Sequence, residues 1–134
     1  MQRHRSQRGF TVLELTVVLT VCAVAWAVAQ PRYGSVVERA RRDEARQRLT
    51  SVWRAQRVYW VRHATFASST DDLVNERLLE PSSVRGDRSF SYEIAGADPW
   101  SFQARAVRQG SDVYEGHLEI DQAGSLVDQI EPPL

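Results

Sequence analysis

Apolar residues are concentrated near the start of the chain, in a run from Phe10 to Ala29 that contains one charged residue, Glu14. A helix of this length is about 30 Å long, which matches the hydrocarbon thickness of a bilayer. A short basic stretch precedes the run, and Gln30-Pro31 follows it. The pattern predicts a membrane-inserting helix. A carboxylate inside such a helix usually marks a function, because its insertion costs about 2.5–3.5 kcal/mol.

The next segment, residues 31–63, has the pattern of an amphipathic helix. Its apolar stripe repeats every three or four positions and comprises Ala45, Leu49, Val52, Gln56, Tyr59 and His63, with Trp53 and Trp60 beside it. Pro31 and Gly34 are expected to bend or loosen the helix, since proline removes a backbone hydrogen bond. We therefore predict one long bent helix over residues 10–63. Its second half should pack on the rest of the chain and bury Leu49, Val52, Trp53, Tyr59 and Trp60.

Residues 64–134 predict a small globular head. After a loop over residues 64–70, Ser69 or Thr70 is placed to cap a short helix that runs to Leu79 and is ended by Pro81. From Ser89 onwards, apolar and polar residues alternate, and turn signals recur roughly every 8–12 residues. This pattern predicts an antiparallel sheet of about four strands, with Trp100 in the core.

Residues Gly9-Phe10-Thr11-Val12-Leu13-Glu14-Leu15, with the basic tail before them and Pro31 after the apolar run, resemble the processing site of type IV prepilins and type II secretion pseudopilins. One long helix laid across a small antiparallel sheet also resembles the α+β fold of type IV pilins. The resemblance implies four parts. They are a leader (1–9), a transmembrane and filament-core helix (10–30), its amphipathic continuation (31–63) and a globular head (64–134).

The resemblance also implies a processing route. A prepilin peptidase and methylase would cut between Gly9 and Phe10 and methylate the new Phe10 amine, and Glu14 would dock one subunit on the next. The implied partners are inner-membrane lipid, the peptidase, other pilin or pseudopilin subunits and an assembly platform. The arginine count around the span argues for a cytoplasmic head. The resemblance instead implies a cytoplasmic N-terminus, a periplasmic head and later entry into a pilus or periplasmic filament.

The net charge of zero conceals a division of the chain. Residues 1–62 hold twelve arginines and four carboxylates, a net charge of +8, whereas residues 63–134 hold five arginines and thirteen carboxylates, a net charge of −8. Either the halves of neighbouring copies attract each other, with Arg41, Arg42 and Arg48 as candidate subunit-contact residues, or the charges form a solvated surface. The single cysteine, Cys22, lies in the apolar run and predicts no intramolecular disulfide.

No pattern predicts catalysis, a metal site or a cofactor. The three histidines lack partners at catalytic or zinc-ligand spacing. Asp98-Pro99-Trp100 is similar to a tripeptide that precedes the calcium loop of the main pseudopilins. However, the later acidic residues are scattered through the predicted strands, which favours a plain turn. We therefore expect a protein that is not an enzyme and has no small-molecule substrate.

Three functions fit these observations. The favoured one is a structural subunit, a minor pilin or pilin-like protein, of a type IV pilus or related filament. A type II secretion pseudopilin is the first alternative, and a tip subunit that contacts DNA, a surface or a secreted substrate is the second. DNA binding ranks below filament packing, because subunit contacts would bury the same arginine-rich helix face. An ordinary secretory signal would also explain the apolar run, but it has no use for Glu14.

Overall fold

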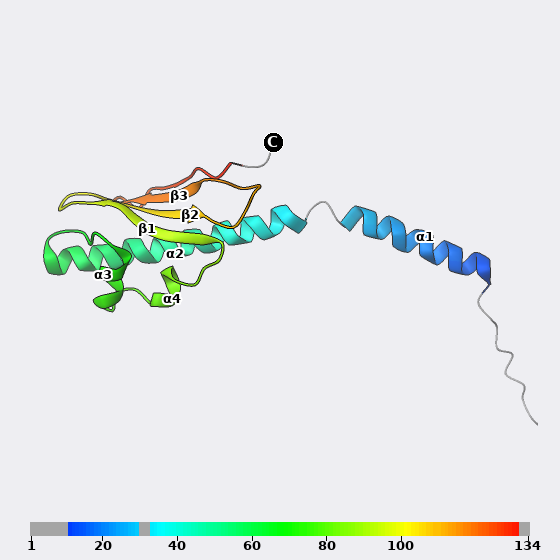
Figure 1. Cartoon of the computed structure of the whole chain (residues 1–134), viewed down its shortest axis with the longest axis horizontal. Coiled ribbons are helices and arrows are strands. Elements are labelled where there is room, and N and C mark those ends of the chain that lie inside the picture. The colour runs from blue at the N-terminus through cyan, green and yellow to red at the C-terminus, as the bar shows by residue number, and fades with distance from the viewer. Residues whose placement is uncertain (1–10, 30–32, 132–134) are drawn as a thin grey trace, which may run out of the picture. The chain divides into compact units, whose positions relative to one another are not determined.

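The computed structural model describes residues 11–29 and 33–131. The chain divides into two compact units, Met1–Glu38 and Arg39–Leu134, and the second is called the head unit below. The elements follow one another along the chain (Figure 1) as α1 (Val12–Ala29), α2 (Tyr33–His63), α3 (Thr70–Asn75), α4 (Pro81–Val84), β1 (Phe90–Ala97), β2 (Phe102–Arg108), β3 (His117–Asp121) and β4 (Leu126–Asp128).

The predicted long helix is described as two helices, α1 and α2, on either side of residues 30–32. Phe10 and Pro31 lie outside the described residues, and the kink expected at Pro31 stays a prediction. Gly34 lies at the start of α2, where a side chain would have room, and its role in a kink also stays a prediction. In the described part of the chain, one helical stretch is long and apolar enough to cross a membrane.

The four strands of the head unit form an antiparallel meander in the order β1-β2-β3-β4. Phe90 pairs with Arg108 at one end of the β1–β2 ladder and Ala97 pairs with Phe102 at the other. The register shifts between Ile94 and Gly96, where β1 carries an irregularity. The predicted fold class, a long N-terminal helix packed on a small antiparallel sheet, is confirmed.

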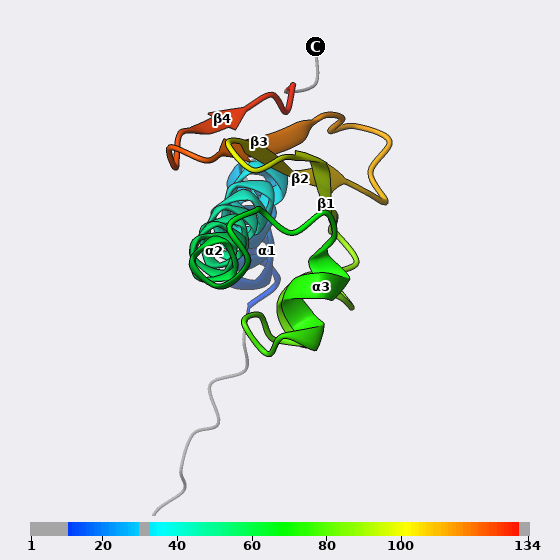
Figure 2. The same cartoon turned by 90° about the vertical axis from the view of Figure 1, so that its left-hand side faces the viewer.

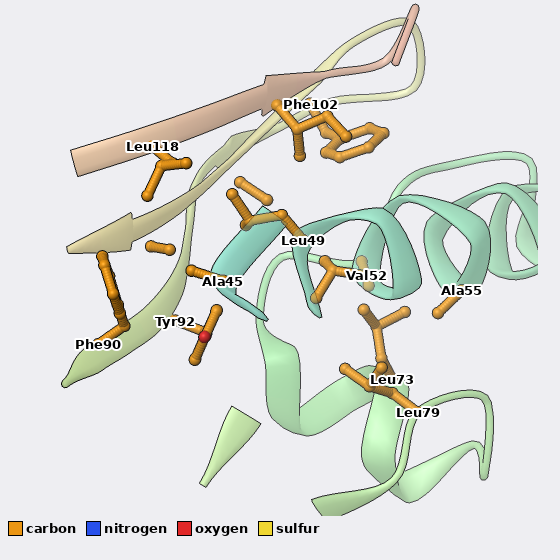
Figure 3. Close-up of a cluster of buried hydrophobic side chains, with 14 of the residues drawn as sticks. Ala45, Leu49, Val52, Ala55, Leu73, Leu79, Phe90, Tyr92, Phe102 and Leu118 are labelled. Atoms are coloured by element: carbon orange, nitrogen blue, oxygen red, sulfur yellow. The ribbon is translucent and has the colours of Figure 1, made fainter. Parts of the chain in front are cut away.

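The core of the head unit lies between α2 and the sheet. Figure 2 shows α2 against one face of the sheet and α3 on the same side, below β1. The helix buries residues three or four positions apart and the strands bury every second residue, as their periods require. The buried side chains (Figure 3) include Ala45, Leu49, Val52, Ala55, Leu73, Phe90, Phe102, Ala104, Ala106, Leu118 and Ile120.

The aromatic stripe of α2 is buried only in part. Leu49 and Val52 are buried as predicted, and Trp53 and Tyr59 are half-buried against the core. The prediction for Trp60 is wrong, because 41% of this residue remains exposed. Its indole N–H donates a hydrogen bond to the carbonyl of Pro99, 2.9 Å away. The ring is thereby held at the turn between β1 and β2.

Two further details differ from the sequence expectations. Ser69 caps α3 through a capping box with Asp72, but the helix ends at Asn75, and Pro81 begins α4 instead of ending α3. Trp100 was expected in the core and is 83% exposed. The Asp98 carboxylate holds residues 98–101 in a turn, so β2 begins only at Phe102.

Candidate assembly surfaces

The helix α1 presents an apolar surface that is exposed along its described length. None of its residues is buried, and its apolar side chains lie on all sides of the helix. Its eighteen residues span about 27 Å, close to the thickness of a bilayer core. A helix that is apolar all round needs a surrounding apolar phase. Lipid and the helices of other molecules are both suitable.

Glu14 is the only charged residue of α1 and lies in its first turn. Its backbone N–H lies 3.1 Å from the carbonyl oxygen of Thr11 and 3.3 Å from the Thr11 hydroxyl. The hydroxyl of Thr11 thus acts as an N-terminal cap, and the spacing Thr-x-x-Glu is that of a capping box. A carboxylate at this position is favoured by the helix dipole. Glu14 was expected from the sequence, whereas the cap formed by Thr11 was not, although the Thr-x-x-Glu spacing signals it.

The two threonine hydroxyls of α1 are satisfied within the helix. The Thr16 hydroxyl donates to the carbonyl of Val12 at 2.6 Å, and the Thr20 hydroxyl donates to the carbonyl of Thr16 at 2.7 Å. Such bonds allow hydroxyl groups to enter an apolar phase. Among the described residues, none supplies a partner for the Glu14 carboxylate. A polar partner for the Glu14 carboxylate must therefore come from outside the described residues.

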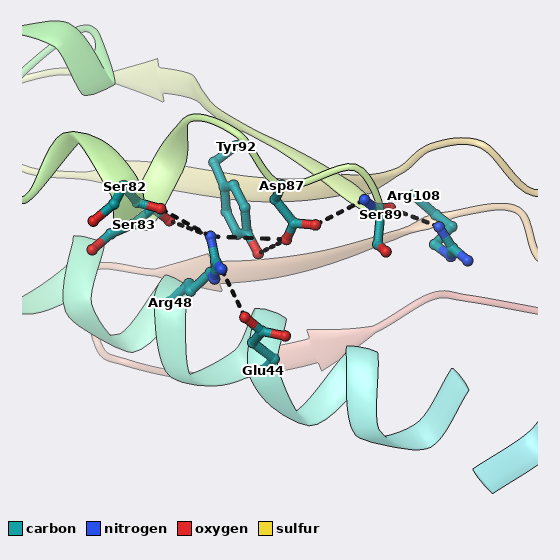
Figure 4. A network of polar contacts seen from close by, with 8 residues as sticks. All are labelled: Glu44, Arg48, Ser82, Ser83, Asp87, Ser89, Tyr92 and Arg108. Atoms are coloured by element: carbon teal, nitrogen blue, oxygen red, sulfur yellow. Dashed lines mark hydrogen bonds and ion pairs between the residues drawn. The ribbon is translucent and has the colours of Figure 1, made fainter. Parts of the chain in front are cut away.

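The three candidate arginines of α2 differ in their surroundings, and Arg48 lies in a network of polar contacts (Figure 4). Its guanidinium donates to Glu44 at 2.7 Å and to the carbonyl of Ser82 at 3.1 Å, and it lies 4.0 Å from Asp87. The hydrogen bond to Glu44 raises the pKa of the Arg48 guanidinium. Arg48 thus ties α2 to the end of α4 and to the segment that precedes β1.

Asp87 extends this network into the sheet. It accepts a hydrogen bond of 3.0 Å from the Tyr92 hydroxyl and one of 2.7 Å from the backbone N–H of Ser89. Burial, followed by the bond to Asp87, raises the pKa of the Tyr92 phenol far above its ordinary value. Arg108 donates to the carbonyl of Ser89 at 2.8 Å. The network is structural, since it joins α2, α4, β1 and β2.

Arg42 and Arg41 lie nearer the start of the same helix. The Arg42 guanidinium lies 3.9 Å from Asp128 and 5.4 Å from the centre of the Tyr114 ring. Arg46 makes a closer ion pair with the same Asp128, at 2.8 Å. Arg41 is exposed. Part of the charge division between helix and head is thus compensated within one chain, and Arg41 is the candidate that faces solvent.

The described residues contain no group of three or more His, Cys, Asp or Glu side chains placed to hold a metal ion. His63 lies 3.3 Å from Glu76, a pairing that its position at the end of α2 did not predict. The same glutamate also lies 3.4 Å from Arg62. These contacts fix the end of α2 to the segment after α3.

An exposed apolar helix with one carboxylate, joined in sequence to a helix packed on a four-stranded meander, is similar to the architecture of type IV pilins. No family model matches the sequence. The chain is 28% identical over 90 residues to the type IV major pilin protein PilA of Myxococcus xanthus (strain DK1622). The match covers 67% of this chain and 38% of that protein. The similarity and the fold together support placing the chain in the type IV pilin family.

Proposed function

We propose that this protein is a structural subunit of a type IV pilus or related filament, either a minor pilin or a pilin-like protein. The observation that carries the proposal is α1, which is apolar on every side, uncovered, and charged at Glu14 alone. Similarity to a major pilin supports the same reading. Other pilin subunits and lipid are its proposed partners, and no catalytic role is proposed.

A simple membrane anchor does not account for Glu14. Placing a carboxylate in hydrocarbon costs about 2.5–3.5 kcal/mol, and an anchor gains nothing in return. A docking role explains the residue, because a cation from a neighbouring subunit would neutralise it. The cation we propose is the Phe10 amine, which is released when a prepilin peptidase cuts after Gly9 and is then methylated.

Gly9 and Phe10 lie outside the described residues, and their roles rest on the sequence. The basic residues before Gly9 and the apolar run after Phe10 are what a membrane peptidase at the cytoplasmic face would meet. After cleavage, the subunit waits in the inner membrane with its head in the periplasm. Assembly then moves α1 from lipid into a bundle with other copies, where its uncovered surface is buried.

Two alternatives keep the same architecture. A type II secretion pseudopilin would form a periplasmic filament and use Glu14 in the same way. A tip subunit would present its head to a surface or secreted substrate, and the exposed Trp100 is the observation that favours this alternative. DNA is the weakest candidate, because Arg46, Arg48 and Arg62 on α2 are already paired with carboxylates.

The proposal is tested by two measurements on the protein from its native cells. Mass spectrometry should find an N-terminal methyl-Phe10, and filaments sheared from the cells should contain the protein. An intact Met1, or an N-terminus near Ala29, would contradict the prepilin assignment. The fraction in the filaments separates the classes, since a major subunit dominates them and a minor subunit is scarce.

A further inference from the structure

The head unit has an apolar hollow at one end of its sheet, with a volume of about 310 Å³. The residues that line it include Arg57, Trp60 and Val61 from α2, Phe66 from the following loop, and Pro99 and Trp100 from the turn between β1 and β2. Hollows of this size with mostly apolar walls and a few polar groups are typical of binding sites. Neither α1 nor the arginines discussed above line it.

The hollow has an exposed tryptophan held in a fixed position. Trp100 is 83% exposed, and a ring in that position contributes little to the core. Its backbone N–H donates to the Asp98 carboxylate at 2.7 Å, and the N–H of Ser101 donates to the same oxygen at 2.7 Å. The turn is fastened to α2 by the bond from Trp60 to Pro99. An aromatic side chain presented on a rigid support is what a binding surface uses, since little freedom is lost on contact.

Arg57 places a positive charge beside the hollow. Its guanidinium lies 5.1 Å from the centre of the Trp53 ring. Within the described part of the chain, no carboxylate lies within ion-pair distance of Arg57. The occupant that fits this site brings a small apolar group together with negative charge.

The opposite end of the sheet presents such a group, in the connection between β2 and β3. Val113 lies in this connection and is 54% exposed. The Ser111 hydroxyl accepts hydrogen bonds from the N–H groups of Val113, at 3.3 Å, and Tyr114, at 2.9 Å, and so fixes the turn. Asp112 and Glu115 flank Val113, and both are exposed.

The acidic charge at this end is not compensated by the described residues. Glu115 forms a backbone bridge with Glu131, which places two glutamates opposite each other. Like charges that face each other across a bridge are unfavourable. Neither of them has an arginine partner in the described ranges. A cation supplied by a second molecule would relieve this repulsion.

Pro99 and Trp100 of the hollow precede β2 and Val113 follows it, and the two connections that carry them lie at opposite ends of β2 (Figure 1). The seven residues of β2 separate them by about 20 Å, so they do not meet within one molecule. Two different surfaces that complement each other make a heterologous contact, and repeating such a contact produces an open chain of subunits. Charge complementarity and geometry thus both point to another copy as the occupant.

We propose that the hollow of one copy receives the turn Gln109–Gly116 of a second copy, with Val113 between the two tryptophans and Glu115 facing Arg57. This contact rests on the proposed function, because it would stack heads along a filament whose shaft is formed by α1. It adds a specific partner surface that the Glu14 docking site does not provide.

Photo-crosslinking in native membranes and sheared filaments tests the contact directly. The full chain carries a photoreactive benzophenone amino acid in place of Val113, or in place of Trp100 as the reciprocal probe. The expected product is a dimer of this chain, in which the Val113 probe is joined to a peptide from residues 57–66 or 98–101. Adducts that map elsewhere, adducts to other proteins only, or no dimer at all would overturn the contact.

A charge exchange tests the pairing. Arg57→Glu and Glu115→Arg should each lower the yield of the dimer crosslink about fivefold, as expected for one partly exposed charge pair. The double variant should restore most of the yield. Arg54→Glu is the matched control, since it reverses an exposed arginine of the same helix that does not line the hollow. A double variant no better than the single ones would exclude the Arg57–Glu115 pairing.

The two proposals fail in distinguishable ways. If the protein is absent from filaments but the dimer crosslink forms in membranes, the head contact is supported and the filament function is contradicted. If the protein is present in filaments but the probes crosslink to other surfaces, the filament function is supported and the head contact is contradicted.

Discussion

Gln56 on α2 and Ala67 in the following loop are joined by two hydrogen bonds between the Gln56 amide and the backbone of Ala67. The amide nitrogen donates to the Ala67 carbonyl at 2.9 Å, and the amide oxygen accepts from the Ala67 N–H at 2.8 Å. Both residues are buried. The side chain therefore completes the backbone hydrogen bonding of a loop that has no ladder of its own.

We expect Gln56→Ala to destabilise the head unit by about 2–4 kcal/mol, because it leaves a buried N–H and a buried carbonyl without partners. Gln56→Glu should also destabilise, since a carboxylate cannot donate to the Ala67 carbonyl. Thermal unfolding of the detergent-solubilised chain, followed by tryptophan fluorescence, measures the change. Gln47→Ala, at an exposed position of the same helix, is the control and should shift the midpoint very little.

Arg48 and Arg41 should respond differently to charge reversal. Arg48→Glu removes the contacts with Ser82 and Asp87 and places a carboxylate beside Glu44 and Asp87. We expect a loss of about 1–3 kcal/mol of head stability, with faster proteolysis. Arg41→Glu should shift the unfolding midpoint less than Arg48→Glu does, because Arg41 is exposed. If Arg41 is a subunit contact, its reversal lowers the filament content, whereas an unchanged content supports a solvated surface.

The network around Asp87 also predicts a dependence on alkaline pH. The raised pKa of Tyr92 means that the folded chain retains the phenolic proton at a pH where the unfolded chain has lost it. Stability is therefore fully present below pH 10, the ordinary tyrosine value, and falls above it by up to about 1.4 kcal/mol per pH unit. Urea unfolding between pH 9 and about 11.5 should show a steeper decline in the parent than in Tyr92→Phe. Equal slopes would exclude Tyr92 as the cause.

The sequence predicted most of the fold because its periodicities are strong. The alternation that starts at Ser89 and the turn residues that interrupt it are sufficient for a meander of four strands. The failures have a common cause. Gln56 was placed on the apolar stripe by spacing alone, and its hydrogen bonds depend on where the chain returns at Ala67. The alternation predicts Trp100 in the core. However, the Asp98 carboxylate accepts a hydrogen bond from the Trp100 N–H, which holds this residue in a turn, and the strand therefore begins after it.

The assembly surfaces were predictable to different degrees. Glu14 was evident because one charge in an apolar run is conspicuous. The internal role of Arg48 was not, since the network to Asp87 and Ser82 joins residues more than thirty positions apart. The hollow beside Trp60 and Trp100 also depends on tertiary structure, because its walls come from α2, the loop after it, the turn between β1 and β2, and Gln122 after β3.

Cleavage after Gly9 can be tested without any change to the head unit. Gly9→Val should block cleavage, because a branched side chain obstructs the peptidase at the cut. The variant should then accumulate in the membrane as the uncleaved chain, with an intact leader by mass spectrometry. Its head should unfold at the same temperature as the parent, since Gly9 is remote in sequence from every core residue. Normal cleavage of Gly9→Val would show that the processing site lies elsewhere in the chain.

The Glu14 carboxylate should be needed for assembly and dispensable for insertion. Glu14→Ala makes α1 more apolar, so the chain still inserts, and cleavage after Gly9 should also continue. What the variant lacks is the acceptor for the Phe10 amine of a neighbouring subunit, and apolar side chains alone discriminate poorly between registers of a helical bundle. An unpaired amine left in a low-dielectric bundle is costly, whereas a paired one is tolerated. We therefore expect several-fold less Glu14→Ala than parent in sheared filaments. Glu14→Asp should be intermediate, because its side chain is one carbon shorter.

Thr11→Ala is the matched control, since it removes the cap of the same helix turn and leaves the charge in place. Cleavage is read by mass and assembly by the amount in filaments. If Glu14→Ala enters filaments as well as the parent, the carboxylate is not the docking group.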